Sequence, residues 1–198
     1  MRKIIVVAAA TVLLTGAAFA QSIGEKTGVN SMLGRSPTTQ DFVKQAVMSD
    51  MLEISAAKIA QQKGNADEKK FASHMITDHG KTSEQLTGLV KSGEVKAEIP
   101  TVLDSSSQSK LDDLNKAKPE DFAALYDPMQ VDAHKDAVSL FERYAAGGDN
   151  PKLKDWAGKT LPALKHHLDM AQQMNESRRS ATVGSSPTKP ASAPAPAR

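Results

Sequence analysis

The stretch SDMLEISAAKIAQQKGNADEKKFASHMITDH, residues 49–79, decides the fold because it holds two helical patterns joined by a tight turn. On both sides of Gly64-Asn65 the apolar residues recur at spacings of three and four, which is the repeat of an α-helix. Asn65 suits an N-cap, and Glu68 three residues later completes a capping-box pattern. We therefore predict helices over about 39–62 and 66–93.

The rest of the central region repeats this helical pattern. Aromatic residues make up only 4% of the chain, and β-branched residues are sparse, so no segment favours a strand. We predict a short helix over 107–115, a third long helix over 119–146 and a fourth from the Asn150-Pro151 cap to about Met174. Pro128 removes an intrahelical hydrogen bond, so we expect a kink or a restart there.

The connection lengths predict how these helices are arranged. The first and last connections are a few residues long, whereas about twenty-five residues separate the second long helix from the third. Short loops require antiparallel neighbours, and a long middle connection can cross the bundle from end to end. The predicted fold is all-α, a ferritin-like four-helix bundle with a long crossover between helices 2 and 3 that carries a short extra helix.

The two ends of the chain differ from the predicted domain, 38–176. Arg2 and Lys3 precede an apolar run that ends at Ala18-Phe19-Ala20, so residues 1–20 are predicted to be a signal peptide cleaved after Ala20. The alternative, an uncleaved membrane anchor, suits the short run less well. We expect 21–37 to be a flexible lead-in and 177–198, rich in Pro, Ala and Ser, to be a disordered tail. The predicted location is periplasmic or secreted.

Composition excludes several classes of function. The chain has no cysteine, which excludes disulfides, thiolate ligands and a cysteine nucleophile, and leaves only N and O ligands for a metal. The full chain has 25 basic and 23 acidic residues, and removal of Arg2 and Lys3 with the signal leaves 23 of each. This neutral balance argues against nucleic acid as a partner. No segment after the signal is apolar enough to span a membrane.

One metal-capable residue on each long helix falls on an apolar face. Glu53, His79, His134 and His167 stand where the helical period expects core residues, whereas His74 and His166 fall on polar faces and are predicted to lie at the surface. The four inward groups supply one oxygen and three imidazole nitrogens, which suits a single ion of Zn, Fe, Cu or Mn. The alternative is a hydrogen-bonded Glu and His network that fixes helix register and binds nothing.

With these residues identified, the chain resembles a family of exported bacterial proteins catalogued as a domain of unknown function and grouped with ferritin-like folds. The resemblance rests on four segments: FVKQAVMSDMLEISAAKIA, FASHMITDHGKTSEQL, QVDAHKDAVSLFERYA and TLPALKHHLDMAQQM. It implies a ferritin-like four-helix domain whose recurrent polar positions are those of Glu53, His79, His134 and His167.

True di-iron proteins carry two Glu-x-x-His pairs, and this chain departs from that pattern. Ile76, Val131 and Leu164 stand three residues before the three histidines. Two metals need more bridging carboxylates than Glu53 provides, so the sequence supports at most a mononuclear site. Asp50, Asp78 and Asp127 would add oxygen ligands only if the helices were rotated from this assignment.

Two functions therefore remain, and a third has less support. The first is an exported ferritin-like protein that binds one transition-metal ion at this cluster, for metal handling or envelope stress. The second is a non-catalytic periplasmic interaction or scaffold protein with an envelope protein as partner, in which the cluster is structural. An oxidase or peroxidase has least support, since no nucleophile motif or Glu-x-x-His pair is present. The sequence does not determine the oligomeric state.

Overall fold

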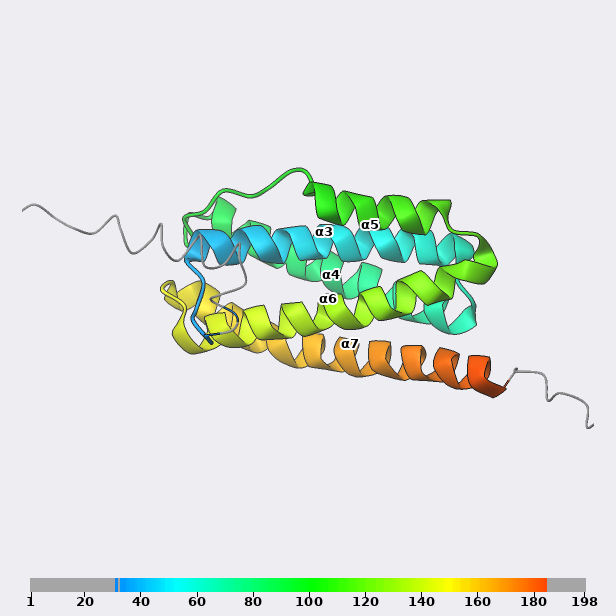
Figure 1. The fold of residues 1–198 in the computed structure, drawn as a ribbon. Helices are drawn as coiled ribbons and strands as arrows, with labels where there is room; N and C mark the ends of the chain where they lie inside the picture. The colour runs from blue at the N-terminus through cyan, green and yellow to red at the C-terminus, as the bar shows by residue number, and fades with distance from the viewer. Residues whose placement is uncertain (1–30, 32, 185–198) are drawn as a thin grey trace, which may run out of the picture.

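The computed structural model describes Ser31 and residues 33–184, which fold into five α-helices with no strand in that part of the chain (Figure 1). The predicted signal peptide lies outside the described residues, as does the chain after Gly184. No described helix is both long and apolar enough to cross a membrane. The helices are α3 (Thr39–Lys63), α4 (Ala66–Lys91), α5 (Ser105–Lys116), α6 (Pro119–Gly147) and α7 (Pro151–Gly184).

The predicted α3–α4 hairpin is confirmed, and its turn is built as the sequence indicates. The Asn65 side chain accepts hydrogen bonds from the backbone N–H groups of Asp67 and Glu68, and the Glu68 carboxylate accepts one from the Asn65 N–H at 2.7 Å. A side chain at Gly64 would come within 2.7 Å of the Ala60 carbonyl oxygen and 2.9 Å of Glu68, so only glycine fits there.

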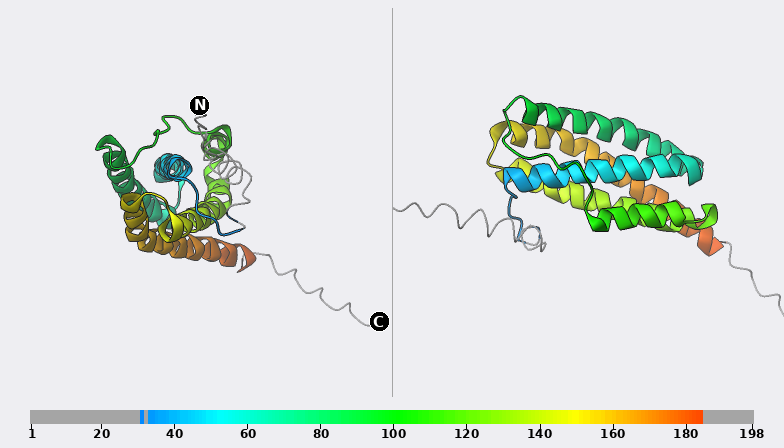
Figure 2. Two further views of the ribbon diagram at one scale, coloured as in Figure 1. Left: turned by 90° about the vertical axis from the view of Figure 1, so that its left-hand side faces the viewer. Right: turned by 90° about the horizontal axis from the view of Figure 1, so that it is seen from above.

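The crossover between α4 and α6 is confirmed by contacts at both ends of the bundle. At one end Asn150, before α7, donates to the Glu94 carbonyl just after α4. At the other, the Lys63 ammonium at the end of α3 donates to the carbonyls of Leu114, Asn115 and Ala117, where α5 ends and α6 is about to begin. The chain thus returns to the α3–α4 turn before α6 starts, and α4 and α6 run parallel (Figure 1). α5 lies outside, along α3 and α6 (Figure 2).

The second hairpin joins α6 to α7 through a short turn. Gly148 packs against Tyr144, where an added side chain would meet the ring at 2.6 Å. Asn150 caps α7 by accepting from the Leu153 N–H at 3.0 Å, as predicted. α6 continues through Pro128, so the restart expected there as one alternative does not occur, and the kink stays a prediction.

The apolar core is divided into two clusters, one at each end of the bundle. Near the α6–α7 turn, Phe42, Leu86, Phe141 and Trp156 belong to the first cluster. Near the α3–α4 turn, Phe71, Met75, Phe122 and Tyr126 belong to the second. Each long helix contributes to both clusters, and on each helix buried polar residues lie near the boundary: Asp50 and Glu53, His79, His134 and His167. A polar layer therefore crosses the middle of the core.

The predicted end of the fourth helix was too early. α7 continues past Met174 to Gly184, so the first eight residues of the range predicted to be a disordered tail, 177–198, are helical. Within this extension Arg178 forms an ion pair with the buried Asp127 on α6 at 3.2 Å. The lead-in also makes contacts, since Arg143 donates to the Arg35 carbonyl at 2.8 Å.

The capping box at Asn65 gives a test of the hairpin. Asn65→Ala removes the acceptor of two backbone N–H groups, and we expect it to lower the free energy of unfolding by about 1 kcal/mol. Asn65→Asp keeps an acceptor in place and should stay within a few tenths of a kcal/mol of the wild type. Urea denaturation followed by circular dichroism measures both. Equal stabilities of the two variants would contradict the role given to the cap.

Candidate metal centre

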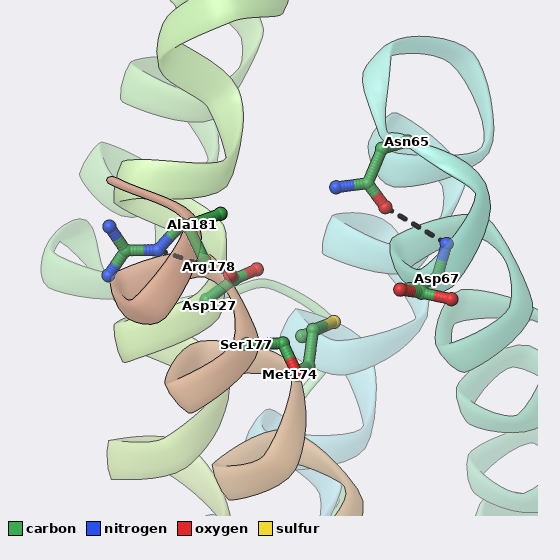
Figure 3. A pocket seen from close by; sticks show the side chains of 7 residues that line it. All are labelled: Asn65, Asp67, Asp127, Met174, Ser177, Arg178 and Ala181. Carbon is green, nitrogen blue, oxygen red and sulfur yellow. Dashed lines mark hydrogen bonds and ion pairs between the residues drawn. The ribbon is translucent and has the colours of Figure 1, made fainter. Parts of the chain in front are cut away.

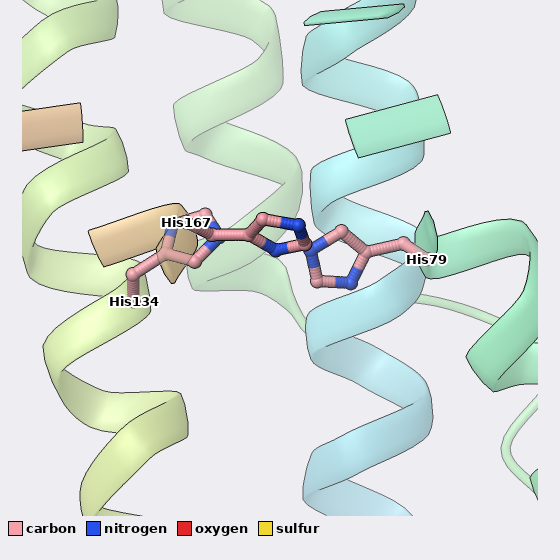
Figure 4. Close-up of side chains that lie close together, drawn as sticks. All are labelled: His79, His134 and His167. Carbon is pink, nitrogen blue, oxygen red and sulfur yellow. The ribbon is translucent and has the colours of Figure 1, made fainter. Parts of the chain in front are cut away.

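Three histidines from three helices meet in the polar layer. His79 on α4, His134 on α6 and His167 on α7 are only 2%, 1% and 3% exposed. Their ring centroids are separated by 5.5 to 5.7 Å, and one nitrogen from each ring lies within 4.8 Å of the other two (Figure 4). Apart from this trio, the described residues contain no comparable group of three or more His, Asp or Glu side chains.

Each ring is held from behind by a hydrogen-bond acceptor. His79 Nδ1 lies 2.7 Å from Asp50 Oδ1, and the other oxygen of Asp50 accepts from the hydroxyls of Thr82 and Ser83. His167 Nε2 lies 3.0 Å from Asp78 Oδ2. His134 Nδ1 lies 2.9 Å from the carbonyl oxygen of Gln130, one turn earlier on α6.

These outer partners determine where the protons sit. A backbone carbonyl can only accept, and so can an ionised carboxylate, so the outer nitrogen of each neutral ring carries the hydrogen. The inner nitrogens, Nε2 of His79, Nε2 of His134 and Nδ1 of His167, are then lone-pair acceptors. All three are buried without a hydrogen-bond partner. Each unmatched acceptor costs about 1–3 kcal/mol, and a carboxylate or carbonyl behind an imidazole is the usual support of a metal-binding histidine.

Burial keeps two of the histidines neutral. It lowers the pKa of His134 to about 4, assisted by the nearby His79, and it lowers the pKa of His167 to about 4 against the opposing effect of the hydrogen bond that the ring donates to Asp78. Burial acts on His79 in the same direction, but the hydrogen bond and charge of Asp50, together with the charge of Glu53, raise its pKa above the ordinary value. His134 and His167 therefore offer free lone pairs near neutral pH.

Glu53 lies beside the histidines but not at their level. It is 1% exposed, and it is not within the 4.8 Å group. Its carboxyl oxygens form no well-aligned hydrogen bond among the described residues, although the Gln130 amide lies close to them. Burial raises its pKa to about 7, against the opposing influence of His79 and the nearby Gln130 amide. The carboxyl is thus poised between its neutral and charged forms close to the three rings.

Helix length explains why Asp50, and not Glu53, contacts His79. Counted from the turn at Gly64, Asp50 and His79 are 14 and 15 residues away, whereas Glu53 is 11 residues away. At about 1.5 Å per residue, Asp50 and His79 stand at nearly the same height, and Glu53 lies about 5 Å closer to the turn. This count was available from the sequence, and it identifies the Asp50–His79 pair that the sequence analysis missed.

A second polar layer lies toward the α3–α4 turn. Glu68 and Asp127, each 1% exposed, interact with each other, and burial raises the pKa of both carboxyls, that of Asp127 to about 7. The Tyr126 hydroxyl is buried and has no hydrogen-bond partner in the described structure. Arg178 pairs with Asp127 beside a surface pocket of about 540 Å³ (Figure 3).

The structure places the residues singled out from the sequence as follows. It brings His79, His134 and His167 together, with Glu53 buried next to them and offset along the bundle. His74 and His166 are exposed, as predicted. Asp50 and Asp78 hold the outer nitrogens of two histidines, and Asp127 belongs to the second polar layer. That all four residues are ligands remains a prediction.

One family model, described as a domain of unknown function (DUF4142), matches residues 24–174. The match includes Glu53 and the three histidines. No curated protein matches the chain, and no solved structure matches it.

The raised pKa of Glu53 predicts how stability depends on pH in metal-free protein. In the unfolded chain Glu53 ionises near 4.5, whereas in the fold it keeps its proton to about 7. The native state therefore binds the extra proton between these values, and stability due to Glu53 falls as the pH rises through them. Glu53→Gln removes this dependence, so the variant should gain up to about 3 kcal/mol relative to the wild type between pH 4.5 and 7.5.

Urea denaturation at half-unit pH steps, with a chelator present, measures this difference. Glu84→Gln makes the same chemical change at an exposed position of α4 and serves as the control. A pH-independent difference between Glu53→Gln and the wild type would show that the carboxyl is not held protonated by burial.

Proposed function

The chain belongs to this family of unknown function, and from its histidine cluster we propose that it binds one transition-metal ion. His79, His134 and His167 are the nitrogen ligands, and Glu53 is the oxygen ligand or the neighbouring countercharge. The role that follows is metal handling in the cell envelope and not catalysis.

The observation that carries the proposal is the convergence of three unpaired nitrogen lone pairs. Each ring donates outward, to Asp50, Asp78 or the Gln130 carbonyl, and presents an acceptor inward. Three acceptors cannot hydrogen-bond to one another, and a cation between them satisfies all three at once. Because His134 and His167 are neutral at physiological pH, a metal displaces no proton from either of them.

The donor set indicates which ions fit. Three imidazoles with one carboxylate nearby suit zinc and copper, and the lack of any cysteine removes competition from soft thiolate sites. A metal–nitrogen bond of about 2.1 Å requires nitrogens about 3.4 Å apart, so the proposal includes a small inward rotation of the rings on binding. Iron and manganese, which prefer more oxygen ligands, fit this set less well.

Burial supports holding an ion over turning over a substrate. Each histidine is at most 3% exposed, so an ion among them is shielded from molecules larger than water. A single carboxylate close to the cluster also falls short of the ligand set of a di-iron oxidase. We therefore place oxidase or peroxidase activity below metal handling.

Export is part of the same proposal. Arg2 and Lys3, the apolar run from Ile4 to Leu14 and the Ala18-Phe19-Ala20 segment are typical of a cleaved signal peptide. A protein released into the periplasm or the medium meets metal ions before they reach the cell interior. A buried site with nitrogen ligands would buffer such ions there.

The second candidate is an interaction or scaffold protein whose polar layer is structural. A surface groove between α3 and the crossover favours it, because Met48, Pro100, Val102 and Leu103 line about 520 Å³ there. Val102 is 73% exposed, which is unusual for a large apolar side chain. If the protein is a scaffold, a protonated His79 donates a hydrogen bond to a neighbouring ring, and the polar layer only fixes helix register.

Metal binding can be measured with a matched pair of histidine variants. We expect wild-type protein from residue 21 onward to bind one equivalent of Zn²⁺ in competition with a chromophoric chelator. His79→Ala should weaken binding by at least about 100-fold, whereas His74→Ala, five residues earlier on the exposed face of the same helix, should leave it unchanged. His79→Leu, which fills the space, guards against loss of fold. Equal affinities in the His79 and His74 variants would refute the assignment.

Stability distinguishes the two candidates. If the ion binds only the folded state, Zn²⁺ at 100 times its Kd should stabilise the wild type by about 2.7 kcal/mol and raise Tm. The fourfold replacement of Glu53, His79, His134 and His167 by leucine should abolish the shift. Calorimetric scans with and without Zn²⁺ measure it. A wild type whose Tm is unmoved by Zn²⁺, Cu²⁺, Mn²⁺ and Fe²⁺ supports the structural reading.

A further inference from the structure

Buried polar atoms without partners are concentrated in one part of the core. Outside the arginines, every buried side-chain nitrogen or oxygen that lacks a hydrogen-bond partner among the described residues belongs to one of eight residues. They are Glu53, Glu68, His79, Tyr126, Asp127, Gln130, His134 and His167. The three histidines account for three of these ten atoms, so the metal site alone does not explain the set.

These residues form a continuous column along the bundle. On α6, Asp127, Gln130 and His134 are spaced by three and four residues and share one face. Tyr126 precedes Asp127 on the same helix and is fully buried. Burial, together with the charges of Glu53, Glu68 and Asp127, raises the pKa of its hydroxyl. Glu53 interacts in turn with Gln130 and His79.

A dry column of this composition would be unstable. Glu53 interacts with Gln130, and Glu68 interacts with Asp127, so these pairs meet part of their own need. The atoms that remain unpaired would each cost about 1–3 kcal/mol, which is large beside the stability of a typical domain. Apolar rings such as Phe71 and Phe122 also pack against the column, so the missing hydrogen bonds cannot all come from neighbouring side chains. Water molecules between the polar side chains would supply them.

One end of the column reaches the surface pocket near the α3–α4 turn. Asp127 lines this pocket together with Arg178, Ser177 and Met174 of α7 (Figure 3). Asp127 itself is 1% exposed, whereas the Arg178 side chain is 27% exposed, so their ion pair stands between solvent and the column. Beyond the pair lie Tyr126 and Gln130, and then the histidines.

We propose that this column is the route by which a cation passes between the pocket and the three histidines, with the Arg178–Asp127 ion pair as its gate. The proposal rests on the metal-binding function proposed above and extends it to the path of the ion. It is distinct from the site itself, since none of the gate residues is a proposed ligand.

The chemistry of the column suits a passing cation. Glu68, Asp127 and Glu53 contribute carboxylates, and Tyr126 and Gln130 contribute neutral oxygens, which replace hydration water weakly and at several points. The three nitrogens at the end bind a transition metal more strongly than these oxygens do. Arg178 is the opposing charge at the pocket end, and when its side chain swings toward the pocket it leaves Asp127 free to receive the ion.

Binding kinetics test the route. Co²⁺ absorption reports uptake in a stopped-flow experiment, and a chelator in excess reports release. Arg178→Gln should speed both steps by about tenfold. Gln130→Leu, an apolar plug, should slow both by a similar factor. Because Arg178 lies outside the site and affects the barrier and not the end states, its replacement should change the two rates together and leave Kd within about twofold.

Arg179→Gln makes the same chemical change at an exposed neighbouring position and should leave both rates at wild-type values. Wild-type rates in both Arg178→Gln and Gln130→Leu, with Co²⁺ still bound through His79, would overturn the route and leave the site standing. Failure of the wild type to bind Co²⁺ or Zn²⁺ would overturn the site and the route together.

A crystal structure of the metal-free protein gives a second readout that does not depend on loading. Ordered waters should bridge Tyr126, Gln130 and Glu53 between the Asp127 layer and the histidines. A column closed by direct side-chain hydrogen bonds, with no water in it, would contradict the proposal whatever the kinetics show.

Discussion

The outer hydrogen bond of each histidine is the interaction on which the structure depends. Without Asp50 behind His79, Asp78 behind His167 and the Gln130 carbonyl behind His134, three imidazoles could not be kept in fixed orientations between two apolar clusters. An unpaired polar group in such a core costs as much as several methylene groups gain on burial. These contacts also join α3 to α4 and α4 to α7, so they link the two hairpins across the bundle.

The crossover puts the histidines at one height. Because the long connection returns the chain to the α3–α4 turn, α4 and α6 start at the same end of the bundle and run parallel (Figure 1). His79 is 14 residues after the N-cap Asn65, and His134 is 16 residues after the N-cap Lys118, so they stand about 21 and 24 Å from that end. In an up-and-down bundle α6 would start at the other end. The height of His134 would then depend on the number of residues from that other end, and it would match the height of His79 only if the two helices had suitable lengths.

Caps, loop lengths and helical period made most of this arrangement predictable from the sequence. Contacts between residues far apart in the chain were not predictable. The capping box at Asn65, the Asn150-Pro151 cap and the unequal loop lengths predicted the helices, the hairpins and the crossover. Helical period selected the three histidines that converge and rejected His74 and His166. The end of α7 was predicted too early, because the Ser and Arg residues after Met174 have the composition of a disordered tail. The helix continues there because Arg178 pairs with Asp127, fifty-one positions earlier in the chain. No spacing within α7 carries that information.

The direction of the outer hydrogen bonds bears on whether the polar layer is a site or a network. A closed network needs donors and acceptors in equal supply, as when one imidazole N–H points at the lone pair of the next. Here the carboxylates and the carbonyl take an N–H from every ring, so the three rings direct only acceptors toward one another. One extra proton on His79, the ring whose pKa is raised, would supply a single donor for two remaining lone pairs. A cation supplies what all three require, and the nearby Glu53 carboxyl can balance its charge by giving up its own proton.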